Sequence, residues 1–147
     1  MSVRLSGPPR RRGRPRFDRA LLLRRARRVL RELGLTRAEL SLVLLDDEGI
    51  AELNRRYRGR EGPTDVLSFS LLEGRHAEFR GPLLGDVVIG IDTAARSAAD
   101  RGVSLDEELL RLLVHGVLHL LGHDHQEVAE ARRMRAAERR LLARLAA

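Results

Sequence analysis

Hydrophobic and polar positions along the chain follow two periods, which predict an alternating order of helices and strands. Apolar residues at helical spacing, bounded by capping residues or glycine, predict helices over 18–33, 46–56, 92–100, 105–121 and 126–145. Short apolar runs between turn residues predict strands over 40–45, 66–70 and 86–91. Residues 58–64 and 71–84 are expected to be loops. This alternation favours an α+β fold, an α/β sandwich in which a small mixed sheet packs with about five helices.

The histidine-bearing segment 105–121 is the clearest of these helices. Ser104 followed three residues later by Glu107 forms a capping box, and Gly122 is a natural helix stop. After Arg111 the segment is apolar on nearly every side, so it is expected to be a buried core helix.

Composition limits the possible classes of protein. A chain of 147 residues is expected to hold one domain, here residues 17–147. Residues 1–16 are rich in Pro, Gly and Arg, and are expected to be a disordered arm. The absence of cysteine excludes disulfides, thiolate metal sites and cysteine nucleophiles. No apolar run reaches membrane length, so a soluble cytoplasmic protein without a membrane partner is expected.

Charge is distributed unevenly along the chain. Residues 1–37 hold 13 Arg against 2 acids, a net +11, whereas residues 38–147 hold 15 Arg against 19 acids, a net −4. Clustered arginines bind nucleic acid by releasing counterions from phosphates. The arm is therefore a candidate contact for RNA or the ribosome, and the alternative is a solvated tail.

Four of the five histidines lie within the eleven residues HGVLHLLGHDH, from His115 to His125. His115 and His119 are four residues apart and therefore project from one helix face. Imidazoles in such an apolar setting are costly unless they are hydrogen-bonded or bound to metal. Spacing alone allows His123 or His125 as a third ligand, and the turn expected at Gly122 favours His125. Three protein ligands leave a position open for water, as in catalytic zinc sites.

The histidine segment resembles the signature of the YbeY family, bacterial metal-dependent endoribonucleases of rRNA maturation. Further matches occur upstream in the family's order, at Leu53–Arg58, Pro63–Phe69 and Leu84–Ile89. The resemblance covers about residues 40–145. One departure is His123, which stands where the family usually has Tyr and adds an imidazole beside the three ligands.

The resemblance implies a mostly parallel four-stranded sheet and a single-strand-specific endoribonuclease. The activity is expected in 16S rRNA 3′-end maturation and ribosome quality control, with rRNA and the small ribosomal subunit or its proteins as partners. One Zn²⁺ held by His115, His119 and His125 is expected to assist phosphodiester hydrolysis. Arg58 is expected to stabilise charge on the phosphate, and Asp124 either moves a proton or orients a ligand histidine. The sequence does not predict the oligomeric state.

Two other functions fit parts of the pattern. A fourth ligand from His123 or Asp124 would close the site and make a non-catalytic, zinc-stabilised ribosome-associated protein. A metalloprotease would use the same His115 and His119 spacing, but its HExxH motif needs a glutamate where this chain has Gly116. Among the other polar residues in the matching segments, Asn54 is either a helix surface residue or an anchor for the following loop.

Overall fold

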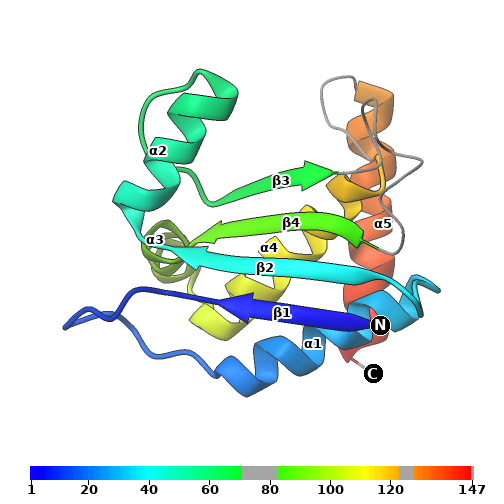
Figure 1. Cartoon of the computed structure of the whole chain (residues 1–147). Helices are drawn as coiled ribbons and strands as arrows, with labels where there is room; N and C mark the ends of the chain where they lie inside the picture. Colours follow the sequence, from blue (N-terminus) through cyan, green and yellow to red (C-terminus); the bar gives the residue numbers. More distant parts are fainter. Residues whose placement is uncertain (71–82, 123–127, 147) are drawn as a thin grey trace.

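The computed structural model describes residues 1–70, 83–122 and 128–146. Within these residues the chain forms four strands and five helices around one sheet (Figure 1). In chain order the elements are β1 (Ser2–Ser6), α1 (Arg19–Glu32), β2 (Glu39–Leu45), α2 (Asp47–Arg58), β3 (Val66–Ser70), β4 (Leu83–Gly90), α3 (Ile91–Arg101), α4 (Leu105–Leu120) and α5 (Val128–Ala146).

The strands form one mixed sheet in the order β1-β2-β4-β3. The strands β1, β2 and β4 run parallel, and β3 pairs with β4 in the antiparallel direction. This confirms the expected α+β class and the mostly parallel four-stranded sheet. Among the described strands β3 lies at the edge of the sheet, where its backbone can accept side chains from outside the sheet.

The two faces of the sheet carry different cores, as the alternation of side chains along each strand requires. Leu40, Leu42 and Leu44 of β2 pack into the larger core with α1, α4 and α5. Val43 and Leu45 belong to a smaller cluster on the opposite face, built around Ile50 of α2. Figure 1 shows α4 and α5 behind the sheet and α2 at its upper left. The histidine-bearing helix and the helix that ends at Arg58 therefore cover opposite faces.

Capping residues set several helix boundaries as the sequence predicted. The Asp18 carboxylate accepts from Leu21 N at the start of α1, and Ser104 Oγ accepts from Glu107 N at the start of α4. The helix α4 ends at Leu120, and Gly122 follows with a φ of 94°. This left-handed conformation is the one that favours glycine after a helix.

The amino-terminal segment corrects one expectation. Residues 2–6, which were expected to belong to a disordered arm, form β1 and pair with β2 in the register Ser2↔Glu39 to Ser6↔Val43. Val3 and Leu5 alternate with polar residues and pack against the larger core. This period-2 signal is only five residues long and stands beside an Arg- and Pro-rich stretch, so composition obscured it. Residues 7–18 form no helix or strand.

Two further boundaries differ from expectation. The N-cap of α3 is Gly90, which makes no side-chain hydrogen bond, and Asp92 lies inside the helix, where its carboxylate accepts from Asp47 N at 3.1 Å. The strand β4 begins at Leu83, so residues 83 and 84, which were expected to end a loop, belong to a strand. The rest of that segment, residues 71–82, lies outside the described residues. No helix in the described part of the chain is both long and apolar enough to cross a membrane.

Candidate functional site

A narrow line of partly exposed residues runs along α4, which is otherwise largely buried. Arg111, His115 and His119 are four residues apart, and every residue between them is buried. Beyond its first turns, the apolar remainder of the helix fills the larger core, so from Arg111 to Leu120 this line is the part that reaches the surface. Both histidines are therefore held in place by a buried helix while their rings remain accessible.

The two imidazole rings lie close enough to bind the same ion. Their centroids are 4.9 Å apart, with 58° between the ring planes. With Zn–N bonds of about 2.1 Å, the centres of two imidazoles on one tetrahedral ion lie on the order of 5 Å apart. The pair in the structure therefore fits two of the expected ligands.

Glu138 of α5 holds one of these rings. Its Oε1 lies 2.5 Å from His115 Nδ1, and both side chains are mostly buried. Burial raises the pKa of Glu138, but the His115 hydrogen bond and the nearby His115 and Arg111 charges outweigh it, so the pKa lies below its ordinary value. An ionised Glu138 accepts a hydrogen bond from Nδ1–H, so that in the neutral ring Nε2 is the nitrogen that carries the lone pair.

The remaining predicted site residues on this side lie outside the described part of the chain. They are His125, the expected third ligand, together with His123 and Asp124. Accordingly, the residues that the structure describes bring together no group of three or more metal-binding side chains. The structure places His115 and His119 side by side and leaves the third ligand and Asp124 as predictions.

The strand β3 fixes the position of this part of α4. Ser68 Oγ donates to Gly116 O at 2.9 Å, and Ser70 Oγ donates to Leu120 O at 3.1 Å. Gly116 itself faces the sheet, where an added Cβ would lie 2.6 Å from Val87 Cγ1. A glutamate at this position would clash with β4, so the structure leaves no room for the general base of a metalloprotease.

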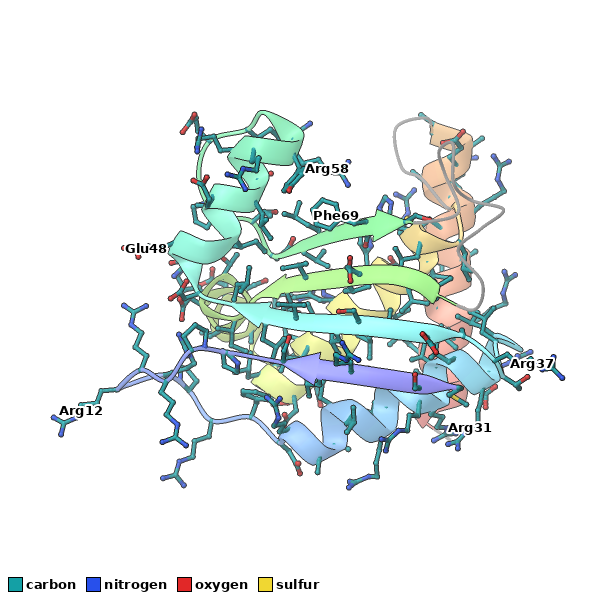
Figure 2. All side chains as sticks on the ribbon, viewed as in Figure 1. Arg12, Arg31, Arg37, Glu48, Arg58 and Phe69 are labelled. Carbon is teal, nitrogen blue, oxygen red and sulfur yellow. The ribbon has the colours of Figure 1, made fainter. Side chains whose placement is uncertain are left out.

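Arg58 reaches the same edge strand from the other face. Figure 2 shows Arg58 beside Phe69. The Arg58 guanidinium lies 5.9 Å from the centre of the Phe69 ring, and the Tyr57 ring packs edge-on against Phe69 with 5.5 Å between the ring centres. Arg58 Nη2 donates to Ser68 O at 2.9 Å. Ser68 therefore contacts α4 through its hydroxyl and Arg58 through its carbonyl. Arg58 is exposed at the sheet edge, while the histidines lie on the α4 side.

The loop after Arg58 is anchored by a buried amide. Asn54 is 6% exposed, and its Nδ2 donates to Gly62 O at 3.0 Å. Of the two alternatives for Asn54, the structure supports the loop anchor. At the end of this loop, Asp65 O accepts from Gly90 N at 2.8 Å, which joins the start of β3 to the end of β4.

Sequence reasoning missed Glu138 and the linking role of Ser68. Glu138 is one of two acids in the arginine-rich helix α5, and no spacing relates it to His115, 23 residues before it. Ser68 lies in the motif TDVLSF that carries part of the family resemblance, so the motif was the available signal.

Comparison with known proteins points to one family. The family model described as Endoribonuclease YbeY matches residues 16–146. A protein named Endoribonuclease YbeY from Geobacter metallireducens is 47% identical over 120 residues, covering 80% of each chain. The one from Anaeromyxobacter sp. is 49% identical over 142 residues, covering 96% of this chain and 70% of its own. The one from Aquifex aeolicus is 49% identical over 119 residues, covering 80% of this chain and 77% of its own.

A solved structure supports the fold. The solution structure of TM1509 from Thermotoga maritima matches with a TM-score of 0.62 at 24% identity, covering 97% of this chain and 88% of that one. At this identity the likeness concerns the fold alone. The family match over nearly the whole chain and the many relatives of high identity carry the assignment: the chain belongs to the Endoribonuclease YbeY family.

Proposed function

We propose that this endoribonuclease is a zinc-dependent hydrolase that cleaves single-stranded rRNA at the 3′ end of 16S rRNA and acts in ribosome quality control. The family supplies the reaction class, hydrolysis of RNA phosphodiester bonds. The rRNA target, the small-subunit partner and a cytoplasmic location are parts of the proposal that the resemblance implies. The observation that carries the metal dependence is the adjacent pair His115 and His119 with Glu138 behind it.

In this proposal His115, His119 and His125 hold one zinc ion. Zinc polarises phosphoryl oxygens and lowers the pKa of a coordinated water when it is bound in such a site. Glu138 keeps the Nδ1 proton on His115, so that the ring presents Nε2 to the ion. Asp124, adjacent to His125 in the chain, is the candidate for proton transfer or for orienting that histidine.

Arg58 is proposed to contact the scissile phosphate. Its charge is exposed, and its guanidinium lies over the Phe69 ring and donates to Ser68 O, so it is held at the β3 edge. A planar guanidinium donates two parallel hydrogen bonds to a phosphate. The hydrogen bond to Ser68 O uses one of its five N–H groups, which leaves others for RNA.

Cleavage of a single-stranded RNA by the purified zinc-loaded protein tests this proposal. His119→Ala is expected to lose both zinc and cleavage, because it removes a ligand. Arg58→Ala is expected to keep its zinc and lose about 100-fold or more in kcat, the size of effect typical of removing a transition-state donor. Arg56→Ala, an exposed arginine of the same helix, is the matched control and is expected to cleave normally.

Zinc content measured by mass spectrometry accompanies each rate. Equal cleavage by all four proteins would contradict the proposal, because neither His119 nor Arg58 would then be needed for cleavage. Zinc retained in full by His119→Ala would contradict the ligand assignment. Unchanged kcat in Arg58→Ala would remove Arg58 from the site.

A further inference from the structure

A charged cavity lies at the opposite end of the sheet from the histidines. It is open to solvent and about 380 Å³ in volume, and it is lined by the loop after β1, the first residue of α2 and one face of α3. The charged lining residues are Arg11, Arg12, Arg14, Asp47, Asp92 and Arg96. The cavity is therefore placed at the carboxyl ends of the parallel strands β1, β2 and β4, where open α/β sheets bind ligands.

Positive charge is in excess around this cavity. Four arginines face two aspartates, and the starts of two helices add partial positive charge. The Asp47 carboxylate is paired with Arg96 at 3.0 and 3.1 Å, and the Asp92 carboxylate accepts from Arg11 at 3.3 Å. Arg12 extends from the tip of the loop into solvent (Figure 2). The lining is thus suited to an anion.

Arg14 supplies the decisive observation. Its side chain is only 8% exposed, and Nη1 donates to Pro9 O. Nε lies 3.5 Å from Asp92 Oδ1 but makes no hydrogen bond, and Nη2 has no hydrogen-bond partner within the described residues. Buried N–H groups of a charged side chain are costly when they have no acceptor. The cavity therefore holds buried N–H donors for which the described residues supply no hydrogen-bond acceptor, although Asp92 forms an ion pair with Nε.

We propose that this cavity binds a backbone phosphate of the RNA substrate, with Arg14 as the central donor and Arg11 and Arg12 beside it. The inference rests on the proposed function in taking RNA as the ligand. The cavity is a second contact, because it lies at the opposite end of the sheet from the histidines. The arginines of the loop after β1 also precede residue 16, where the family match begins.

The position of the cavity predicts which RNAs use it. The histidine side of α4 contacts β3 at Ser70, which pairs with Gly85 near the start of β4, whereas Asp92 follows the end of that strand. The five residue steps from Gly85 to Gly90 span roughly 17 Å at about 3.3 Å per residue. A strand of several nucleotides can therefore contact both places, and a dinucleotide cannot.

Binding of RNA to the metal-free full-length protein tests the proposal without cleavage. The probe is a single-stranded RNA longer than the roughly 4–16 nucleotides of one binding surface. Arg14→Ala is expected to raise Kd about tenfold and to lower the salt dependence of log Kd by about 0.7, the value for one lost phosphate contact on single strands. Arg37→Ala, an exposed arginine at the other end of the molecule, is the matched control (Figure 2).

Asp92→Asn gives a prediction of opposite sign. This change removes a carboxylate that competes for Arg11 and Arg14, while the amide oxygen still accepts from Asp47 N. RNA is expected to bind about threefold to tenfold more tightly, a gain that misfolding cannot produce. In parallel, titration with inorganic phosphate is expected to shift the Nε–Hε resonance of Arg14 in the wild type.

Three results would overturn the cavity as a phosphate site. The first is an equal loss of RNA affinity in Arg14→Ala and Arg37→Ala, and the second is an unchanged affinity in Asp92→Asn. The third is an Arg14 resonance that phosphate does not shift, which would mean that water satisfies the Arg14 donors. Failure of the wild type to bind RNA at low salt would overturn both the cavity and the RNA substrate of the proposed function. Equal binding by all variants would overturn the cavity alone.

Discussion

The contact between His115 and Glu138 determines which nitrogen of His115 is available. A neutral imidazole has one protonated and one free nitrogen, and the hydrogen bond made by one decides the role of the other. The carboxylate holds the proton at Nδ1 through a 2.5 Å contact. It also fixes the plane of the ring beside His119.

We therefore predict that Glu138→Ala weakens zinc binding by about 10- to 100-fold, the usual effect of removing a carboxylate behind a ligand histidine. The zinc affinity of Glu138→Gln is expected to lie between those of the wild type and Glu138→Ala, since the amide oxygen of Gln still accepts from Nδ1. Competition with a chromophoric chelator measures the affinity, and Glu130→Gln on the same helix is the control. Wild-type affinity in Glu138→Ala would contradict this role.

At the level of elements, α4 depends on a close approach to the sheet. Gly116 has no side chain, and its position brings the helix axis near Val87 of β4 and allows the hydrogen bond from Ser68. His115 and His119 flank this contact, one residue before it and three after it. Displacing the helix from the sheet would move both rings relative to Glu138.

Gly116→Ala is predicted to destabilise the fold by about 1–3 kcal/mol, despite the better helix propensity of alanine, because overpacking outweighs the gain of about 1 kcal/mol. Chemical denaturation measures the loss. Val87→Ala in the same chain opens space, so the double variant is expected to lose less than the two single changes together. Strictly additive losses would show that the Val87 contact is not the cause.

Predictability also varied among elements for physical reasons. The helices α1 and α4 were predicted nearly to the residue, since Asp18 and Ser104 act locally through hydrogen bonds that the sequence itself encodes. The strand β1 was missed because its pairing with β2 lies more than thirty residues away in the chain. A five-residue edge strand has almost no local signal.

Across the whole molecule, a buried ion pair joins the helices behind the site. Glu108 is 1% exposed, and its carboxylate accepts hydrogen bonds from Arg111 Nε and Nη2 at 3.0 and 2.7 Å. Arg101 Nη1 of α3 lies 3.7 Å from the same carboxylate. The Arg111 hydrogen bonds hold the pKa of Glu108 below its ordinary value, against the effect of burial. Arg111 also lies 4.0 Å from Asp65, so the pair extends to the start of β3.

This pair predicts an acid-sensitive contribution to stability. Because the folded-state pKa of Glu108 is lowered, its contribution is full above the unfolded value of about 4.5 and is lost as pH falls toward the folded value. Glu108→Gln is expected to cost about 1–3 kcal/mol at neutral pH, since the half-buried Arg111 loses the carboxylate that accepts its hydrogen bonds. In this variant the free energy of unfolding should also decrease less steeply as the pH falls below 4.5.

Urea denaturation at a series of pH values measures this, with the exposed Glu107→Gln as the control. If the free energy of unfolding of Glu108→Gln falls as steeply at acid pH as that of the wild type, the acid sensitivity belongs to other carboxylates. Asp47 and Glu138 also have lowered pKa values, so part of the acid limb is expected to persist in the variant.

The sequence by itself determined the reaction class and much of the fold. The long histidine motif and TDVLSF identified the family, and the family match confirms an endoribonuclease with the expected mixed sheet. It also placed His115 and His119 on one helix face, because helical periodicity is a local property of the backbone. Features that depend on residues close together in the chain could be predicted from the sequence.

Tertiary structure alone decided the contacts between distant segments. It brought Glu138 of α5 to His115, placed Arg58 and α4 on opposite sides of β3 with Ser68 between them, and added β1 to the sheet. It also formed an open, arginine-lined cavity at the carboxyl ends of three parallel strands. These arrangements depend on which faces pack together, and packing between segments far apart in sequence is set by the whole core rather than by any one segment's pattern.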